Sequence, residues 1–265
     1  MVVWITGASS GIGEACAYEY ARQGAQQADP VRLILTASSQ AKLEKVAEAC
    51  VRMGAEAYVL PCDLSDPMAV EALSAQAWAH YGAIDTAFLN AGLSQRTTVE
   101  DTSMDMVRRI MEINYFAPVA IAKDLLPRML ARGGGYIAVT TSIAGRFGFP
   151  LRCAYSSSKH ALYGFFETLQ AENYDRGLRV TIVCPGRVNT PISLRALDKG
   201  GKAHGRMDPG QAGGLNVDKA ARQIVRAIRK GRREVLVGKG ELVMVYIKRF
   251  FPGLCAWIGR HISAV

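Results

Sequence analysis

The chain has 265 residues, of which 49% are hydrophobic and 21% are charged, so it can bury one sizeable core. This length suits one α/β domain and is short for two, and we predict a single domain over residues 1–265. The net charge is +9, but residues 217–265 hold 11 of the 32 Lys and Arg residues against 3 of the 23 acidic ones. Because the rest of the chain is close to neutral, we do not expect a nucleic-acid-binding surface.

The cysteines and the first residues bear on the cellular compartment. The six cysteines form no C-x-x-C pair and no zinc-ligand spacing, so we expect reduced thiols and no bound metal. An apolar strand pattern begins at Val2, which leaves no room for a leader peptide, and no apolar run reaches membrane-spanning length. These features favour a cytoplasmic protein.

Short β-branched runs alternate along the chain with longer segments of helical periodicity. The predicted strands span residues 2–5, 31–36, 57–60, 84–89, 136–140, 180–184 and 234–237. The predicted helices lie near residues 11–24, 40–53, 66–80, 101–131, 153–175 and 217–230. This alternation predicts an α/β fold of the Rossmann type, a doubly wound parallel sheet of about seven strands with helices on both faces. Ligands of such folds bind at the carboxyl ends of the strands.

A glycine-rich turn joins the first predicted strand to the first predicted helix. Residues 6–13 read Thr-Gly-Ala-Ser-Ser-Gly-Ile-Gly, so the glycines follow the spacing G-x-x-x-G-x-G. Backbone N–H groups and the positive end of the helix dipole at such a turn favour a bound phosphate. The candidate phosphate-binding residues are Gly7, Ser9, Ser10, Gly11, Ile12 and Gly13.

A tyrosine and a lysine lie four residues apart in the predicted helix 153–175. Tyr155 and Lys159 therefore share one face of that helix, where the ammonium favours the phenolate. A free tyrosine has a pKa of about 10, so a neighbouring cation brings it closer to working pH as an acid-base catalyst. Ser142, just after the strand 136–140, can donate a hydrogen bond to a substrate oxygen in the same crevice.

In this order, the motifs resemble those of the short-chain dehydrogenase/reductase family over at least residues 1–192. Four further segments of the chain match the family's pattern. They are Asp63 and Leu64 after the third strand, Asn90, Ala91 and Gly92 after the fourth, Asn114 in the following helix, and Pro185, Gly186, Val188 and Thr190 after the sixth.

The resemblance implies an oxidoreductase that uses a nicotinamide dinucleotide and no metal. Tyr155 would exchange a proton with the substrate oxygen, and Ser142 would orient and polarise that oxygen. Lys159 would lower the pKa of Tyr155 and bond the nicotinamide ribose, while Asn114 would hold a water that links Lys159 to solvent. From the residues alone, Asp63 could equally cap the next helix and Asn114 could be an ordinary polar residue of its helix.

The matched segments are also expected to surround the dinucleotide. The Asp63 and Leu64 pair falls where the family contacts the adenine, and residues 90–92 border the cofactor. Residues 185–190 would run beside the nicotinamide.

The end of the second strand bears on the choice of nicotinamide cofactor. A preference for NAD usually needs an acid at this position, whereas the chain continues after the strand as Ala-Ser-Ser with no acid in reach. NADP(H) is therefore favoured, with Ser38, Ser39 and Lys42 as candidate contacts to the 2′-phosphate. The arginine that many NADP(H)-dependent relatives carry here is absent, so NAD(H) stays an alternative.

The predicted substrate pocket is largely apolar, which suits an apolar ketone, aldehyde or secondary alcohol. Its expected walls are Ile143, Phe147, Phe149, Leu151, Val188, Ile192 and Leu194. Arg146, Arg152 and Arg187 could instead select an acidic group, although solvent-facing positions are commoner for such side chains.

Two segments lie outside the core that carries the motifs. Residues 193–216 are rich in glycine and predict either a flexible lid over the substrate or a disordered loop. Residues 241–265 form an apolar and basic C-terminal extension, which could contact a second subunit, lie on a membrane surface or cover the chain's own core. The resemblance implies a homodimer or homotetramer.

The sequence thus predicts hydride transfer between NADP(H) and the carbonyl or secondary alcohol of a small apolar molecule, with Tyr155 as general acid and base. An NAD(H)-preferring dehydrogenase is one alternative. A dinucleotide-binding sensor or scaffold without turnover is another.

Overall fold

A computed structural model describes residues 1–25 and 29–261. Its centre is one sheet of seven strands, all parallel, in the order β3-β2-β1-β4-β5-β6-β7. The strands are β1 (Val2–Thr6), β2 (Arg32–Thr36), β3 (Glu56–Val59), β4 (Thr86–Leu89), β5 (Gly135–Thr140), β6 (Leu178–Pro185) and β7 (Glu234–Val237). The order reverses between β1 and β4, which is where ligands of such sheets bind.

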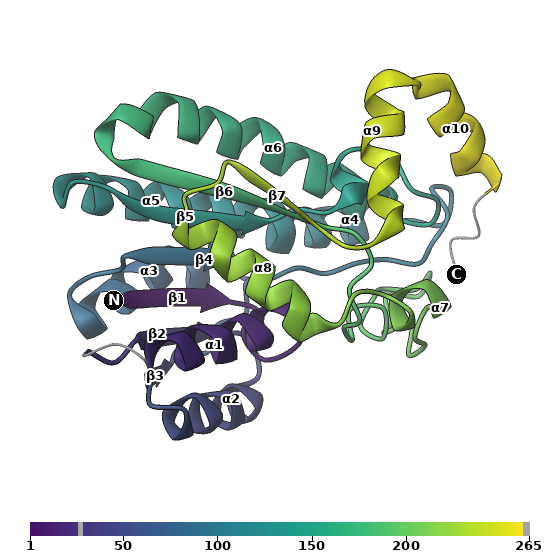
Figure 1. Cartoon of the computed structure of the whole chain (residues 1–265). Helices are drawn as coiled ribbons and strands as arrows, with labels where there is room; N and C mark the ends of the chain where they lie inside the picture. The colour runs from purple at the N-terminus through teal and green to yellow at the C-terminus, as the bar shows by residue number, and fades with distance from the viewer. Residues whose placement is uncertain (26–28, 262–265) are drawn as a thin grey trace.

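Helices cover both faces of this sheet (Figure 1). The helices of one layer are α1 (Gly11–Gly24), α2 (Gln40–Arg52) and α8 (Val217–Arg229), and those of the other are α3 (Pro67–Tyr81), α5 (Ala117–Ala131) and α6 (Cys153–Asn173). Alternation along β1 explains the two cores, because successive side chains of a strand point to opposite faces. Val3 and Ile5 belong to the core under α1, α2 and α8, whereas Val2 and Trp4 belong to the core under α3, α5 and α6.

The predicted fold class is confirmed, and the strands differ from the predicted ranges by one or two residues at some ends. One predicted element is wrong in detail. The helix expected over residues 101–131 begins later, as α4 (Met104–Met111), and passes through a π-helical stretch, η1 (Glu112–Phe116), into α5. Such π-bulges often occur at functional sites, and this one contains Asn114.

The segment 193–216 is mostly irregular and contains one short helix, α7 (Pro209–Ala212). Bridges tie Leu197 to Gln95 and Leu215 to Val188, so the segment lies against the carboxyl end of the sheet. Its flexibility stays a prediction.

The C-terminal extension consists of η4 (Gly240–Leu242), α9 (Val243–Phe250) and α10 (Pro252–His261), and its last four residues, 262–265, lie outside the described part of the chain. Figure 1 shows α9 and α10 projecting from the body, at the same end as α7. Among the described residues, no helix combines the length and the apolar character needed to cross a bilayer.

Candidate active site

The glycine turn after β1 has the backbone that its sequence requires. Gly7 and Gly11 have φ angles of 68° and 61°, which favour glycine because a Cβ is strained there. A Cβ on Gly13 would lie 2.3 Å from the carbonyl oxygen of Gly7, so the turn and the start of α1 can pack only with glycine at that position. Ser10 is the N-cap of α1. The turn therefore presents the first N–H groups of a 14-residue helix to the space above it.

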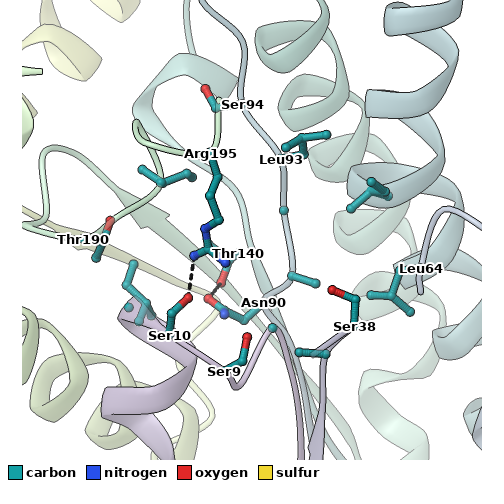
Figure 2. A pocket seen from close by; sticks show the side chains of 18 of the residues that line it. Ser9, Ser10, Ser38, Leu64, Asn90, Leu93, Ser94, Thr140, Thr190 and Arg195 are labelled. Atoms are coloured by element: carbon teal, nitrogen blue, oxygen red, sulfur yellow. Dashed lines mark hydrogen bonds between the residues drawn. The ribbon is translucent and has the colours of Figure 1, made fainter. Parts of the chain in front are cut away.

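Asn90 connects the ends of three neighbouring strands. Its backbone N–H donates to the Thr6 hydroxyl at 3.0 Å, and its side-chain oxygen accepts from the Thr140 hydroxyl at 3.0 Å. Thr6 ends β1, Thr140 ends β5, and Asn90 directly follows β4. This bonding fixes the floor of the crevice at the switch point of the sheet (Figure 2).

A cleft runs along the carboxyl ends of these strands, and most of the predicted cofactor residues line it. They are Gly7, Ser9, Ser10, Gly11, Ile12, Ser38, Asp63, Leu64, Asn90, Ala91, Gly92, Tyr155, Lys159 and Thr190. Its further lining residues include Ser94, Thr140 and Arg195, which no motif indicated. The glycine cradle, which a Cβ would fill, and the cleft above it, which extends from the residues after β2 and β3 to Tyr155 and Lys159, fit a dinucleotide.

Six predicted cofactor residues lie elsewhere, among them Lys42, which is exposed in the first turn of α2. Gly13 packs beneath the turn, and Ser39 is the N-cap of α2. Pro185, Gly186 and Val188 line the neighbouring pocket instead of the cleft.

The structure also separates two roles that the sequence left open near β3. Asp66 caps α3 by accepting the N–H of Met68 at 3.0 Å, so Asp63 is not the cap of this helix. Asp63 accepts both the N–H and the hydroxyl of Ser65, which lowers the pKa of its carboxyl. Asp63 therefore lines the cleft as a carboxylate.

Tyr155 lies in the first turn of α6 and is buried beside Ser142. Burial raises the pKa of its phenol, and a hydrogen bond with Ser142 and the charges of Arg152 and Arg96 act in the opposite direction. The raised pKa means that the phenol is protonated at neutral pH. The Ser142 hydroxyl also lies 3.4 Å from the carbonyl oxygen of Pro185, and the N–H of Ala144 donates to it at 3.2 Å.

Lys159, one turn further along α6, is buried with its ammonium against the end of β5. Its Nζ donates to the carbonyl oxygen of Thr140 at 2.7 Å, and burial lowers its pKa to about 7. The ammonium lies 5.9 Å from the centroid of the Tyr155 ring. The groups that lower the pKa of Tyr155 in this geometry are thus Ser142 and the two arginines, while the sequence pointed to Lys159.

Asn114 is fully buried and saturated by protein groups. Its Nδ2 donates to the carbonyl oxygen of Leu93 at 2.9 Å and to the hydroxyl of Ser158 at 2.9 Å, and its Oδ1 accepts the N–H of Leu93 at 2.8 Å. A Cβ on Gly92 would come within 3.3 Å of Lys159 Nζ and 3.5 Å of Asn114 Oδ1. Asn114 therefore holds the loop that follows β4 close to Lys159.

A second pocket opens on the other side of Tyr155. Of the predicted substrate walls it is lined by Ile143, Phe149, Val188 and Ile192, and of the three predicted arginines by Arg152 and Arg187. Arg146 is directed away from it and pairs with Glu234 at 2.6 Å. Tyr155 lines both this pocket and the cofactor cleft, as do Thr140, Thr190 and Ile192, so the two spaces adjoin along these residues.

Three charged residues form a buried cluster in the second pocket. Asp208 accepts from Arg96 at 2.5 Å and from Arg152 at 3.1 Å. Burial and the charge of Arg96 lower the pKa of Arg152 to about 10. The position of Arg152 contradicts the solvent-facing alternative, because its side chain is only 13% exposed. Sequence reasoning missed Arg96 and Asp208 because they lie 112 residues apart, in segments without a motif.

The fold and the site together define the class of protein. The doubly wound sheet and its glycine cradle suit a nucleotide, and the buried Tyr, Lys and Ser set with its two adjoining pockets suits an oxidoreductase. The model of the short chain dehydrogenase family matches residues 1–199. The chain belongs to the short-chain dehydrogenase/reductase family.

Curated relatives support this membership. The chain is 36% identical to the Dehydrogenase/reductase SDR family member 7B of Mus musculus, over 96% of this chain and 78% of the relative. It is also 36% identical to the Dehydrogenase/reductase SDR family protein 7-like of Drosophila melanogaster, over 97% of this chain and 78% of the relative.

Solved structures share the fold. An alcohol dehydrogenase from the archaeon Thermococcus sibiricus, complexed with 5-hydroxy-NADP, is 30% identical with a TM-score of 0.75, over 90% of this chain and 96% of that one. A short-chain dehydrogenase/reductase from Burkholderia phymatum, in complex with NAD, has a TM-score of 0.82 at 24% identity, over 96% of this chain and 94% of that one. The chain is thus an oxidoreductase with a site for a nicotinamide dinucleotide.

Proposed function

We propose that the protein transfers hydride between NADP(H) and the carbonyl or secondary alcohol of a small molecule. The observation that carries this proposal is the position of Tyr155, which lines the cofactor cleft on one side and the second pocket on the other. A group that exchanges a proton with the substrate must reach the oxygen while the reacting carbon faces the cofactor. Tyr155 is buried at the place where both conditions can be met.

When bound, the nicotinamide supplies the hydride. The phenol of Tyr155 is protonated at neutral pH, since burial raises its pKa from an ordinary value of about 10, and it donates its proton to the carbonyl oxygen during reduction. The Ser142 hydroxyl, held between Ala144 and Pro185, orients that oxygen and stabilises its growing negative charge. Lys159 is held by the Thr140 carbonyl and would bond the nicotinamide ribose, and Asn114, bonded to Leu93 and Ser158, keeps the neighbouring loop in place.

The cofactor is proposed to be NADP(H) rather than NAD(H). Ser38 lines the cleft after β2, and no acid follows this strand to accept from a ribose hydroxyl. The matched structures include one with an NADP derivative and one with NAD, so family membership is compatible with either. A fluorescence titration with NADPH and NADH distinguishes them, and tighter binding of NADH would contradict the preference.

The substrate is proposed to have an apolar body that contacts Ile143, Phe149 and Ile192. We would test this with a panel of ketones, aldehydes and secondary alcohols, and measure turnover from the nicotinamide absorbance. The panel should include carbonyl compounds with and without a carboxylate, since Arg152 and Arg187 also line the pocket. Turnover of no member, together with normal NADPH binding, would favour the alternative of a non-catalytic sensor or scaffold.

We further propose that the protein is a cytoplasmic homodimer or homotetramer that uses the exposed face of α9 and α10 as a subunit contact. Tyr246, Phe250, Phe251 and Trp257 are all more than half exposed on these helices. Lys248, Arg249 and Arg260 lie among them, so peripheral contact with a membrane is the alternative. The opposite face, with Ile247 and Cys255, packs on the body.

A further inference from the structure

Arg195 reaches into the cofactor cleft from the segment that follows β6. Its guanidinium Nη2 donates to the hydroxyl of Ser10 at 2.5 Å, which joins two residues 185 positions apart in the chain. Figure 2 shows the side chain crossing the cleft toward the glycine turn, above Asn90 and beside Thr140. Neither the glycine motif nor the Tyr155 and Lys159 pair indicates this residue.

Its position along the cleft identifies the part of a dinucleotide that it faces. Ser38 and Asp63 mark the end of the cleft at β2 and β3, where the adenosine half binds in doubly wound folds. Tyr155 and Lys159 mark the opposite end, where the reacting ring must lie. Ser10 lies between these ends, at the N-terminus of α1, which is the place of the pyrophosphate.

Charge supports the same assignment. The ionisable lysine, arginine and acidic residues that line the cleft are Asp63, Lys159 and Arg195. The glycine turn itself contains no lysine or arginine, and Lys159 donates to Thr140 at the far end. Arg195 therefore supplies the cation nearest the helix N-terminus, where a fork of guanidinium donors matches phosphate oxygens.

We propose that Arg195 binds the pyrophosphate of the nicotinamide dinucleotide, together with the turn at Ser10, and thereby holds the segment 193–216 closed over the cofactor. This inference rests on the proposed function only in requiring that a dinucleotide binds in the cleft. It places the arginine of the cleft at the centre of the cofactor, away from the 2′-phosphate.

The location predicts which cofactors are affected by loss of Arg195. NADPH and NADH share the pyrophosphate, so Arg195→Ala should weaken both by a similar factor, about 10- to 100-fold for a lost charge-assisted hydrogen bond. A contact to the 2′-phosphate would weaken NADPH alone. Arg195→Lys should have an intermediate effect, since an ammonium retains the charge and loses the fork.

The experiment is a fluorescence titration of the wild type and these variants with NADPH and NADH. Arg206→Ala is the matched control, because Arg206 is an exposed arginine of the same segment. Melting temperatures without cofactor verify folding, and Arg195→Lys and Arg195→Gln replace the alanine variant if it fails to fold. Unchanged dissociation constants, or a loss confined to NADPH, would overturn the proposal.

Limited trypsin digestion gives a second readout. Lys199, Lys202 and Arg206 are exposed cleavage sites in the segment 193–216. Saturating NADPH should protect them in the wild type and not in Arg195→Ala at the same occupancy, and equal protection would contradict the closure. If the wild type bound neither dinucleotide, the proposed function itself would fail, which is a different result from a loss confined to the variants.

Discussion

Among single residues, Lys159 shows that the site costs folding free energy, because its ammonium is buried. Its ammonium is buried and bonded to one carbonyl, and its pKa falls from the usual 10.5 to about 7. The unfolded chain therefore binds a proton that the folded chain has lost between pH 7 and 10.5, so this group's contribution to stability rises with pH across that window. Below pH 7 both states are charged, and the desolvation penalty is fully present.

Replacing Lys159 with methionine removes this titration. In the cofactor-free protein we expect the free energy of unfolding of Lys159→Met to exceed that of the wild type most near pH 6. This difference should shrink progressively toward pH 10. At about 1.4 kcal/mol per pKa unit, the change amounts to several kcal/mol. Urea unfolding at a series of pH values measures the difference, and a pH-independent difference would show that Lys159 has no depressed pKa.

Asp208 carries the second residue-scale prediction. Its carboxylate faces two guanidiniums, and the side chains of Arg96 and Asp208 are only 3% and 7% exposed. Asp208→Asn removes the carboxylate that pairs with the buried Arg96, and we expect the free energy of unfolding to fall by about 3–5 kcal/mol. The matched control is Asp105→Asn, whose ion pair with Arg108 is largely exposed and should matter by less than about 1 kcal/mol. Equal effects of the two substitutions on denaturant unfolding would contradict this role.

The sequence indicated Tyr155, Lys159 and the glycine turn because each belongs to a short motif of fixed spacing, and it indicated Ser142 by its place just after a predicted strand. Arg96, Arg195 and Asp208 belong to no motif, since their roles depend on contacts between segments far apart in the chain. Burial, the largest effect, raises the pKa of Tyr155, and the opposing charges of Arg96 and Arg152 were missed because these arginines reach the pocket only after folding.

At the scale of elements, the junction of β1 and α1 depends on close packing at Gly13. Gly13→Ala would place a methyl group 2.3 Å from the Gly7 carbonyl oxygen and 2.7 Å from the Asn90 amide, so the turn must shift. We expect NADPH affinity to fall by at least about tenfold, because the N–H groups at the start of α1 would no longer point toward the phosphate.

Gly164→Ala is the control for this substitution. Gly164 lies in α6, and a Cβ there meets nothing within 4 Å. This variant should bind NADPH normally and gain up to about 1 kcal/mol of stability from helix propensity. A wild-type dissociation constant of Gly13→Ala for NADPH would show that the turn does not need glycine at this position to bind the cofactor.

Strand and helix order were predictable because the apolar periodicity switches repeatedly between the two element types. The π-helical stretch η1 was not, since its sequence continues an ordinary helical pattern from α4 into α5. It contains the buried Asn114, whose three hydrogen bonds go to Leu93 and Ser158, contacts that the local sequence does not reveal.

At the scale of the whole molecule, the exposed face of α9 and α10 predicts assembly. The double substitution of Phe250 and Trp257 by serine should lower the native mass, because both side chains are more than half exposed and would be buried between subunits. Met68→Ser, at an exposed apolar position on α3, is the control. An unchanged mass with loss of binding to anionic liposomes would favour the membrane contact instead.

Tyr155 lines both pockets, and in the proposed function its phenol moves the proton. The most direct measurement compares wild type and Tyr155→Phe for NADPH affinity and for turnover of the best carbonyl compound of the panel. We predict an unchanged dissociation constant within about threefold and a loss of turnover of about 10²- to 10⁴-fold, the usual contribution of a general acid. Turnover of Tyr155→Phe at the wild-type rate would show that the Tyr155 phenol does not move the proton.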